Sequence, residues 1–443
     1  MRNINSYREI WRISYPIILG SVAQNIVNVT DTIFLGRLGV VALGAAGNAG
    51  IFYFVLMVVG LGFSVGMQII IGRRNGENNH AAIGDLITQG VYFLLPLATL
   101  GFLFMQYLSP FILREVTASE EILNATIDFL KYRSFGVFFA FFNYLFIGFY
   151  TGITQTKVLT YTTVVQGIVN IIFDYLLIFG HFGFPEMGIT GAATASVISE
   201  IAAVSFFIVY TKKHINFSHY QLLESLKFKS SKLLRMLKIS APIMLQNFMS
   251  IASWLVFFMI IEQIGQTELA ASHIVRSIYM VLMIPLFGFS SATSTLVSNL
   301  IGSNKVNQVL SLTKKVLLLS LSLTALFTPI TLLFPNQLGL IYTDQKEIIE
   351  AVRSLLYVIS FSMLFFSVAM ILFSAVTGTG KTVYSLVIEI VSIAIYLSVA
   401  YLVGVHFNMD LWLVWCSEFI YFGVMASLAG LYLRFGNWKS ANV

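Results

Sequence analysis

Two aspartates, Asp31 and Asp174, stand out because each lies in a stretch of sequence that is otherwise apolar. A carboxylate inside a bilayer is costly and by default marks a functional site. Asn170 precedes Asp174 by four residues, so the two side chains share one face of a helix. Two carboxylates in one apolar site cannot both ionise cheaply unless a cation enters. These residues therefore predict a site that binds and releases a proton or a sodium ion on carboxylate and amide oxygens.

Neutral polar residues in the same and neighbouring apolar stretches could complete this site. Gln24 lies two helical turns before Asp31, and Asn28 lies closer on the same helix. Pro16 in that helix frees a backbone carbonyl and allows a kink. Hard cations prefer oxygen ligands, so amides and hydroxyls elsewhere also qualify. Thr194 and Ser196 are the candidate hydroxyl ligands of the cation, and we expect Gln24, Asn28 and Asn143 to line the substrate cavity.

The composition requires these residues to be placed by membrane-spanning helices. Of the 443 residues, 57% are hydrophobic and only 10% are charged, whereas a soluble protein carries about 25% charged residues. Twelve apolar segments are long enough to cross roughly 30 Å of hydrocarbon. We therefore expect an all-α integral membrane protein. The predicted spans are 10–35, 45–71, 84–108, 127–149, 159–180, 189–210, 236–261, 272–300, 309–334, 350–375, 384–404 and 411–433.

The distribution of cations predicts the orientation of these spans. If the N-terminus is cytoplasmic, 19 of the 26 Lys and Arg residues fall on the cytoplasmic side. The other seven, Arg133 among them, fall at or near outside loops. This asymmetry predicts a multi-pass protein of the inner or plasma membrane, with both termini cytoplasmic. Loop cations also explain the net charge of +6, so we expect membrane lipid and no nucleic acid as a partner. We also expect the protein to be a monomer.

The two halves of the chain repeat each other at an offset of 226 residues. Ile13–Ile17 matches Ile239–Ile243, Gly62–Ser64 matches Gly288–Ser290, and Thr151-Gly152 matches Thr377-Gly378. Because each half has six spans, both halves enter the membrane from the same side. We expect two six-helix bundles related by a pseudo-two-fold axis along the membrane normal, with a cavity between them. The predicted domains are an N-lobe over 1–210, a cytoplasmic linker over 211–235 and a C-lobe over 236–443.

The chemistry of the repeat is asymmetric although its fold is symmetric. At the same offset, Asp31, Asn170 and Asp174 are replaced by Phe257, Tyr396 and Ala400. Structural residues would be expected to recur in both halves, so the asymmetry favours a functional role for the N-lobe acids. Glu200, Glu389 and Glu418 are further acids inside spans. We interpret Glu389 as a carboxyl held by structural partners, and a functional role is the alternative.

The sequence offers no convincing catalytic motif. Gly62-Phe63-Ser64-Val65-Gly66 has the spacing of a nucleophile elbow, but that motif needs a strand–turn–helix context, and this stretch lies inside an apolar span. Small residues that allow close helix packing are the better explanation. The six histidines show no close ligand spacing. We therefore expect no enzyme and no cofactor.

The residues described above resemble the multidrug and toxic compound extrusion (MATE) family, most closely its DinF-like branch. The proline of the first span corresponds to Pro16, the cavity glutamine to Gln24, and the span-four amide to Asn143. The cation site of that branch corresponds to Asp31 and to the pair Asn170 and Asp174. The family's Gly-Ala-Ala-x-Ala-Thr stretch reads Gly191-Ala192-Ala193-Thr194-Ala195-Ser196, which leaves either Thr194 or Ser196 as the hydroxyl ligand. The acids of NorM-like proteins in spans seven and ten are missing.

The resemblance implies a secondary active transporter. Such an antiporter would export amphipathic organic cations by alternating access, driven by inward flow of protons or sodium ions. The alternative within the same superfamily is a flippase for lipid-linked oligosaccharides. Flippases of this kind carry basic residues in the cavity, and almost no Lys or Arg lies within the spans here. The sequence leaves open which ion drives transport and which substrates are carried.

Overall fold

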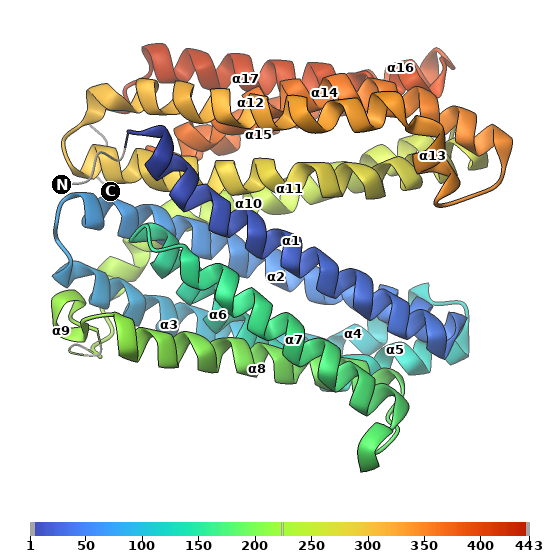
Figure 1. Ribbon diagram of the computed structural model, residues 1–443, viewed down its shortest axis with the longest axis horizontal. Helices are drawn as coiled ribbons and strands as arrows, with labels where there is room; N and C mark the ends of the chain where they lie inside the picture. Colours follow the sequence, from blue (N-terminus) through green and yellow to red (C-terminus); the bar gives the residue numbers. More distant parts are fainter. Residues whose placement is uncertain (1–4, 223, 225, 440–443) are drawn as a thin grey trace. The chain divides into compact units, whose positions relative to one another are not determined.

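The computed structural model describes residues 5–222, 224 and 226–439, and this part of the chain consists of helices joined by turns and loops, without strands (Figure 1). Eleven helices in it are long and apolar enough to cross a membrane. The pair α5 (Glu120–Arg133) and α6 (Gly136–Gly152), bent by 52° at the break between them, is also long and apolar enough when counted as one span. The all-α architecture is therefore confirmed, with eleven candidate spans in the described residues, or twelve with this pair. Helices are expected because backbone polar groups in lipid must be satisfied within their own segment.

The other long helices follow the predicted apolar segments closely. In the first half they are α1 (Tyr7–Leu38), α2 (Val40–Gly76), α3 (Ala81–Leu103), α7 (Lys157–Phe179) and α8 (Ile189–His214). A π-helical turn, Phe104–Leu108, joins α3 to α4 (Ser109–Val116). In the second half they are α10 (Ser230–Glu262), α11 (Gln266–Gly302), α12 (Val309–Leu333), α14 (Lys346–Gly378), α15 (Thr382–Tyr401) and α17 (Ser417–Phe435). Short helices are α9 (Phe217–Tyr220), α13 (Pro335–Leu340) and α16 (Leu411–Trp415).

The helices form two compact units. One unit is Tyr15–Met244, and the other combines the segment ending at Ser14 with Leu245 onward. The predicted domain limits follow the linker, whereas these units divide inside α1 and inside α10. The predicted lobes also include residues 1–4 and 440–443, and the predicted linker includes 223 and 225, all outside the described residues.

In the first unit, α1 and α7 run in the same direction, and side chains join them at separate levels. The Thr160 hydroxyl of α7 donates a hydrogen bond to the Pro16 carbonyl, at 2.6 Å. Side chains further along α1 meet residues further along α7 in the same order, so Asp31 and Asp174 are brought to the same level. The further contacts are Gly20 with Thr163, Val27 with Gly167, and Phe34 with Phe179.

Small residues of α2 allow close helix packing in the same unit. A Cβ atom at Gly62 would lie 2.6 Å from the Met244 Cα, and one at Gly66 would lie 2.7 Å from the Ser240 Cα. Ser64 between them donates a hydrogen bond to the Tyr144 carbonyl, at 2.6 Å. This stretch is helical, so the nucleophile-elbow spacing reflects packing between helices.

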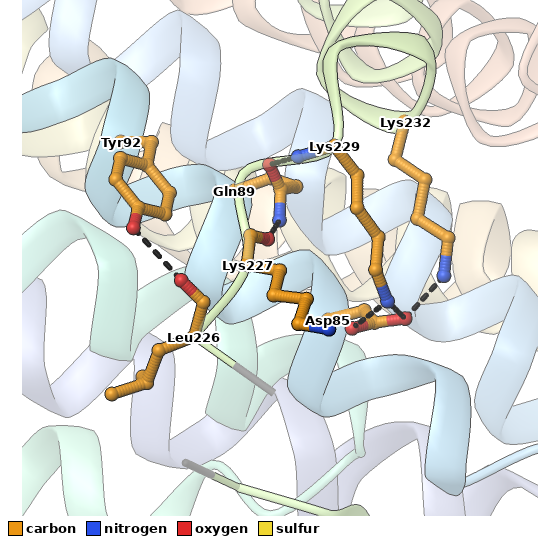
Figure 2. Close-up of polar contacts among 7 residues, drawn as sticks. All are labelled: Asp85, Gln89, Tyr92, Leu226, Lys227, Lys229 and Lys232. Atoms are coloured by element: carbon orange, nitrogen blue, oxygen red, sulfur yellow. Dashed lines mark hydrogen bonds and ion pairs between the residues drawn. The ribbon is translucent and has the colours of Figure 1, made fainter. Parts of the chain in front are cut away.

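The linker between the two halves is held against α3 by hydrogen bonds and ion pairs (Figure 2). The buried Gln89 side chain donates to the Lys227 carbonyl at 3.0 Å and accepts from the Lys229 amide at 2.8 Å. Tyr92 donates to the Leu226 carbonyl at 2.8 Å, and Lys229 pairs with Asp85 at 2.8 Å. Lys232 contacts the same carboxylate. The segment 226–232 therefore forms a strap, a stretch of the linker that is attached to the side of α3.

Candidate functional site

The structure places the carboxyl groups of Asp31 and Asp174 within hydrogen-bonding reach of each other, inside the first unit. Asp174 is 1% exposed, and neither of its oxygens has a hydrogen-bond partner among the described residues. Asp31 is half-buried, and its Oδ1 is likewise without a partner there. Two ionised carboxylates can only accept hydrogen bonds. The contact between them is therefore favourable only when one holds a proton or when a cation lies between them.

The amide of Asn170 lies one helical turn before Asp174 on α7 and is 2% exposed. Neither its oxygen nor its nitrogen has a hydrogen-bond partner among the described residues. Leaving a buried amide unpaired costs about 1–3 kcal/mol, so such groups call for an explanation. Next to an acid pair, the amide oxygen is a suitable ligand for a small cation. The structure thus brings Asp31 and Asp174 together and places Asn170 on the same face of α7 as Asp174.

Helix α8 packs on α7, and its geometry separates the two candidate hydroxyls. Gly191 marks the face against α7, because a Cβ there would lie 2.6 Å from the Leu177 carbonyl oxygen. At about 100° per residue, Thr194 lies about 60° from that face and Ser196 about 140° from it. The Thr194 hydroxyl donates to the Thr190 carbonyl at 2.8 Å, and its lone pairs remain available as acceptors. Thr194 is therefore the better placed of the two.

The polar residues of α1 differ in how they relate to the acid pair. Gln24 donates to the Asn28 side-chain oxygen at 3.2 Å, and Asn28 is exposed. Asn28 lies one turn before Asp31, so these three residues form a polar stripe along α1. Pro16 lies inside a single continuous helix. Its own carbonyl is bonded to Thr160, so Pro16 is also a point of attachment to α7.

A buried ion pair lies close to this site and was not predicted. Arg133, at the break between α5 and α6, pairs with Glu200 of α8 through two bonds of 2.7 and 3.0 Å. The Tyr53 hydroxyl donates to Glu200 at 2.7 Å, and the Arg133 guanidinium lies 3.6 Å from the centre of the Tyr53 ring. Asn143 donates to the Glu200 carbonyl at 3.5 Å. Arg133 also acts electrostatically on Asp31.

The sequence could not separate Arg133 from the loop cations near it. Lys131, two residues earlier, is 57% exposed, whereas the Arg133 side chain is 13% exposed. The one local signal is Gly136. A Cβ at this position would lie 2.1 Å from the Arg133 Nη1 and 2.3 Å from the Glu200 Oε2, so the ion pair requires glycine there.

The second unit also buries carboxyl groups, although its sequence lacks the aspartates of the first. Glu389 of α15 and Glu418 of α17 are 2% and 3% exposed. Ser250 and Tyr421 hydrogen-bond to Glu389, so this carboxyl has partners on two other helices. Acidic chemistry is therefore present in both units, at positions that the repeat does not relate.

Comparison with known proteins gives a consistent picture. The MatE family model matches the sequence twice, over residues 16–176 and 242–402, and these matches start 226 residues apart, which confirms the internal repeat. The probable multidrug resistance protein NorM of Thermotoga maritima is 26% identical over 443 residues, covering 98% of this chain and 94% of the relative. The probable multidrug resistance protein YoeA of Bacillus subtilis is 24% identical, covering 98% and 96%.

The fold is also found among solved structures. A structure described as the outward-facing conformation of a multidrug resistance MATE family transporter of the MOP superfamily aligns with a TM-score of 0.89. It is 20% identical, and the alignment covers 98% of this chain and 97% of that one. At this identity the likeness confirms the fold, and the roles of individual residues have to be argued from the site.

Proposed function

Because this chain belongs to the MatE family of multidrug and toxic compound extrusion proteins, we propose that it exports amphipathic organic cations in exchange for protons or sodium ions. The names of its relatives support the substrate class, since NorM and YoeA are described as probable multidrug resistance proteins. Transport would proceed by alternating access through a monomer in the inner or plasma membrane, with both termini cytoplasmic. The cation asymmetry of the sequence supports this orientation.

The observation that carries the proposal is the acid pair with its unpaired amide. Asp31 and Asp174 lie within reach of each other, and the Asn170 amide beside them has no partner among the described residues. A proton would turn the contact of the two carboxyls into a hydrogen bond. A sodium ion would take oxygens from both acids, from Asn170 and from Thr194. Either ion removes the repulsion between two buried carboxylates.

The driving ion acts through the helices that hold the acids. Asp31 is on α1 and Asp174 is on α7, so ion binding draws these two helices together at the acid pair. The acid pair lies closer to the C-terminal ends of both helices than the Pro16–Thr160 hydrogen bond does. An ion can shift the protein between conformations only if it binds one more tightly than the other. Separation of α1 from α7 changes the distance between the acids, which gives the required difference in affinity.

Alanine substitution of each aspartate tests this site. We expect Asp31→Ala and Asp174→Ala to remove drug resistance in a sensitive host, because each leaves a single carboxyl that no longer shares its ion. Asp128→Ala is the matched control, since Asp128 is 54% exposed and pairs only with Lys131 on the surface. Equal amounts of each variant in the membrane must be verified by immunoblot. Resistance retained by both Asp31→Ala and Asp174→Ala would refute the proposed site.

The driving ion can be identified in proteoliposomes. With purified protein, substrate uptake is measured under a proton gradient alone and under a sodium gradient alone. We expect one gradient to drive uptake in the wild type, and neither to do so in the Asp31→Ala variant. Uptake that needs neither gradient would contradict antiport while leaving the family membership unaffected.

A lipid-linked oligosaccharide flippase is less well supported. Such a substrate carries a pyrophosphate and requires unpaired cations along the transport path. Arg133, the buried arginine beside the acid pair, is already bonded twice to Glu200 and is not available for a phosphate. A deletion strain with normal drug sensitivity and a cell-envelope defect would favour the flippase.

A further inference from the structure

The second unit contains two buried carboxyl groups whose partners are hydroxyls. Glu389 accepts hydrogen bonds from the Ser250 hydroxyl of α10, at 2.5 Å, and from the Tyr421 hydroxyl of α17, at 2.8 Å. Glu418 of α17 accepts a hydrogen bond from the Ser362 hydroxyl of α14, at 3.1 Å. Among the described residues neither glutamate forms an ion pair. Two full negative charges in this interior would lack compensation.

Two tyrosines lie near these glutamates, and their hydroxyl groups lack hydrogen-bond partners among the described residues. The Tyr279 hydroxyl of α11 lies beside Ser362 and Glu418, and the Tyr396 hydroxyl of α15 interacts with Glu418 electrostatically. Tyr279 and Tyr396 are 0% and 2% exposed, and neither hydroxyl has a hydrogen-bond partner of good geometry among the described residues. A buried polar group in this state indicates a site whose occupant supplies the missing bond.

The two carboxyls belong to one continuous cluster. Tyr421 follows Glu418 by three residues on α17, so both lie on one face, and Tyr421 reaches Glu389. Tyr396 lies two turns after Glu389 on α15, and its ring is 5.1 Å from that of Tyr421. Tyr421 and Tyr396 therefore connect Glu389 and Glu418 into one cluster.

We propose that Glu389 and Glu418 form a proton-binding site in the second unit, separate from the acid pair of the first. Hydroxyl partners suit a group that must exist in two states. A hydroxyl donates to an ionised carboxylate and accepts from a protonated one, so either state finds a partner. An arginine partner would hold only the ionised state, as Arg133 does for Glu200. The site needs no contribution from Asp31 or Asp174.

A metal ion fits this lining less well than a proton. Ser250 and Tyr421 direct their O–H groups at the same oxygen of Glu389, and a cation would have to displace both. In the part of the chain that the structure describes, no group of three His, Cys, Asp or Glu residues could hold a metal. On α11, His273 and Arg276 both contact the Phe258 ring. Among the described residues, the titratable groups that interact with Glu389 or Glu418 are Tyr279, Tyr396 and Tyr421.

Infrared spectroscopy of the purified protein in lipid tests the proposal, because only a protonated carboxyl shows the carbonyl stretch of a carboxylic acid. The parent is the variant Asp31→Asn with Asp174→Asn, which removes the acids of the first unit. At pH 7 exposed carboxyls are ionised, since their ordinary pKa values are about 4. We expect an acid band in this parent that loses part of its amplitude with Glu389→Gln or Glu418→Gln and is lost when both are present.

The glutamine variants keep the size of the side chain and an acceptor for the hydroxyls. Glu262→Gln is the control, because Glu262 is exposed at the end of α10 and should leave the band unchanged at pH 7. If a glutamine variant fails to fold, Tyr421→Phe removes one donor from Glu389 and should shift the band frequency. No acid band in the parent, a band unaffected by both glutamine substitutions, or an unshifted band in Tyr421→Phe would overturn the proposal. Drug resistance is not measured, so the result is independent of the transport tests.

Discussion

Buried glutamates in this protein fall into two chemical types according to their partners. Glu200 contacts a guanidinium and a tyrosine hydroxyl, whereas Glu389 and Glu418 contact hydroxyls. A cation partner fixes the charge of the carboxylate, while hydroxyls accommodate both of its states. The first type suits a rigid anchor near the acid pair, and the second type suits a group that changes its proton occupancy.

Removal of Glu200 should be far more damaging than removal of a surface charge. Glu200→Ala leaves Arg133 buried without its carboxylate, and breaking a buried pair from one side costs about 3–5 kcal/mol. Lys131→Ala is the matched control, because Lys131 and Asp128 are 57% and 54% exposed and such pairs contribute about 0–1 kcal/mol. Chemical unfolding in detergent measures both. Equal stability of the two variants would show that Arg133 is compensated elsewhere.

The sequence predicted the residues of the acid pair but not the residues around them. Asp31, Asn170 and Asp174 are polar in apolar stretches, so their cost in a bilayer makes them visible. Arg133 lies at the end of a polar helix segment, where composition gives no reason to expect burial. Its burial depends on the 52° bend between α5 and α6, which is a tertiary feature. The choice between Thr194 and Ser196 likewise required the face of α8 that meets α7.

At the level of elements, two attachments define the first unit. One is the parallel contact of α1 with α7, which runs from the Thr160–Pro16 hydrogen bond to the acid pair. The other is the docking of the segment 226–232 on α3. Before α3, the His80 ring contacts the ring of His219 in the linker at a tilt of 36°, with the centroids 4.3 Å apart. Burial, with His219 beside it, lowers the pKa of His80, so this contact favours a neutral His80.

Replacement of Gln89 should release the strap. Gln89→Leu conserves volume but removes two hydrogen bonds to the linker backbone. At about 1 kcal/mol for each bond, opening of the segment should become roughly 30-fold more frequent. Limited digestion with trypsin measures this, since cleavage after Lys227, Lys229 and Lys232 requires the segment to leave α3.

Thr99→Val is the matched control for this change. Thr99 is on α3 as well, is exposed, and bonds only to the Leu95 carbonyl of its own helix. Cleavage at Lys212 and Lys213, which lie at the end of α8, should be equal in all variants. A Gln89→Leu protein cut in the segment 226–232 at the rate of the Thr99→Val protein would show that Asp85 and Tyr92 alone hold the strap.

At the scale of the whole molecule, the repeat is preserved in backbone contacts and lost in chemistry. Gly152 of α6 packs on the Gln68 carbonyl, and Gly378 of α14 packs on the Ser294 carbonyl. These two contacts are related by the offset at which the family model matches twice. Tyr53 and Tyr279 are related by the same offset, and each lies beside a buried glutamate. The two glutamates, Glu200 and Glu418, are not related by the offset. Residues that are identical at this offset therefore mark conserved contacts between helices within the repeat. The positions of the buried acids differ because each unit has a different function.

Alanine at the two related glycines tests this symmetry. A Cβ at Gly152 would lie 3.0 Å from the Gln68 oxygen and 2.6 Å from an Ile71 methyl, and a Cβ at Gly378 would lie 2.6 Å from the Ser294 oxygen. Such overpacking costs about 1–3 kcal/mol, so both variants should melt at lower temperature than the wild type. Gly423→Ala in α17 is the control, because nothing lies within 4 Å of its added Cβ and alanine is the better helix former by about 1 kcal/mol. The two packing variants should therefore fall on one side of the wild type and the control on the other. A loss confined to one half would mean that the repeated contact supports only that unit.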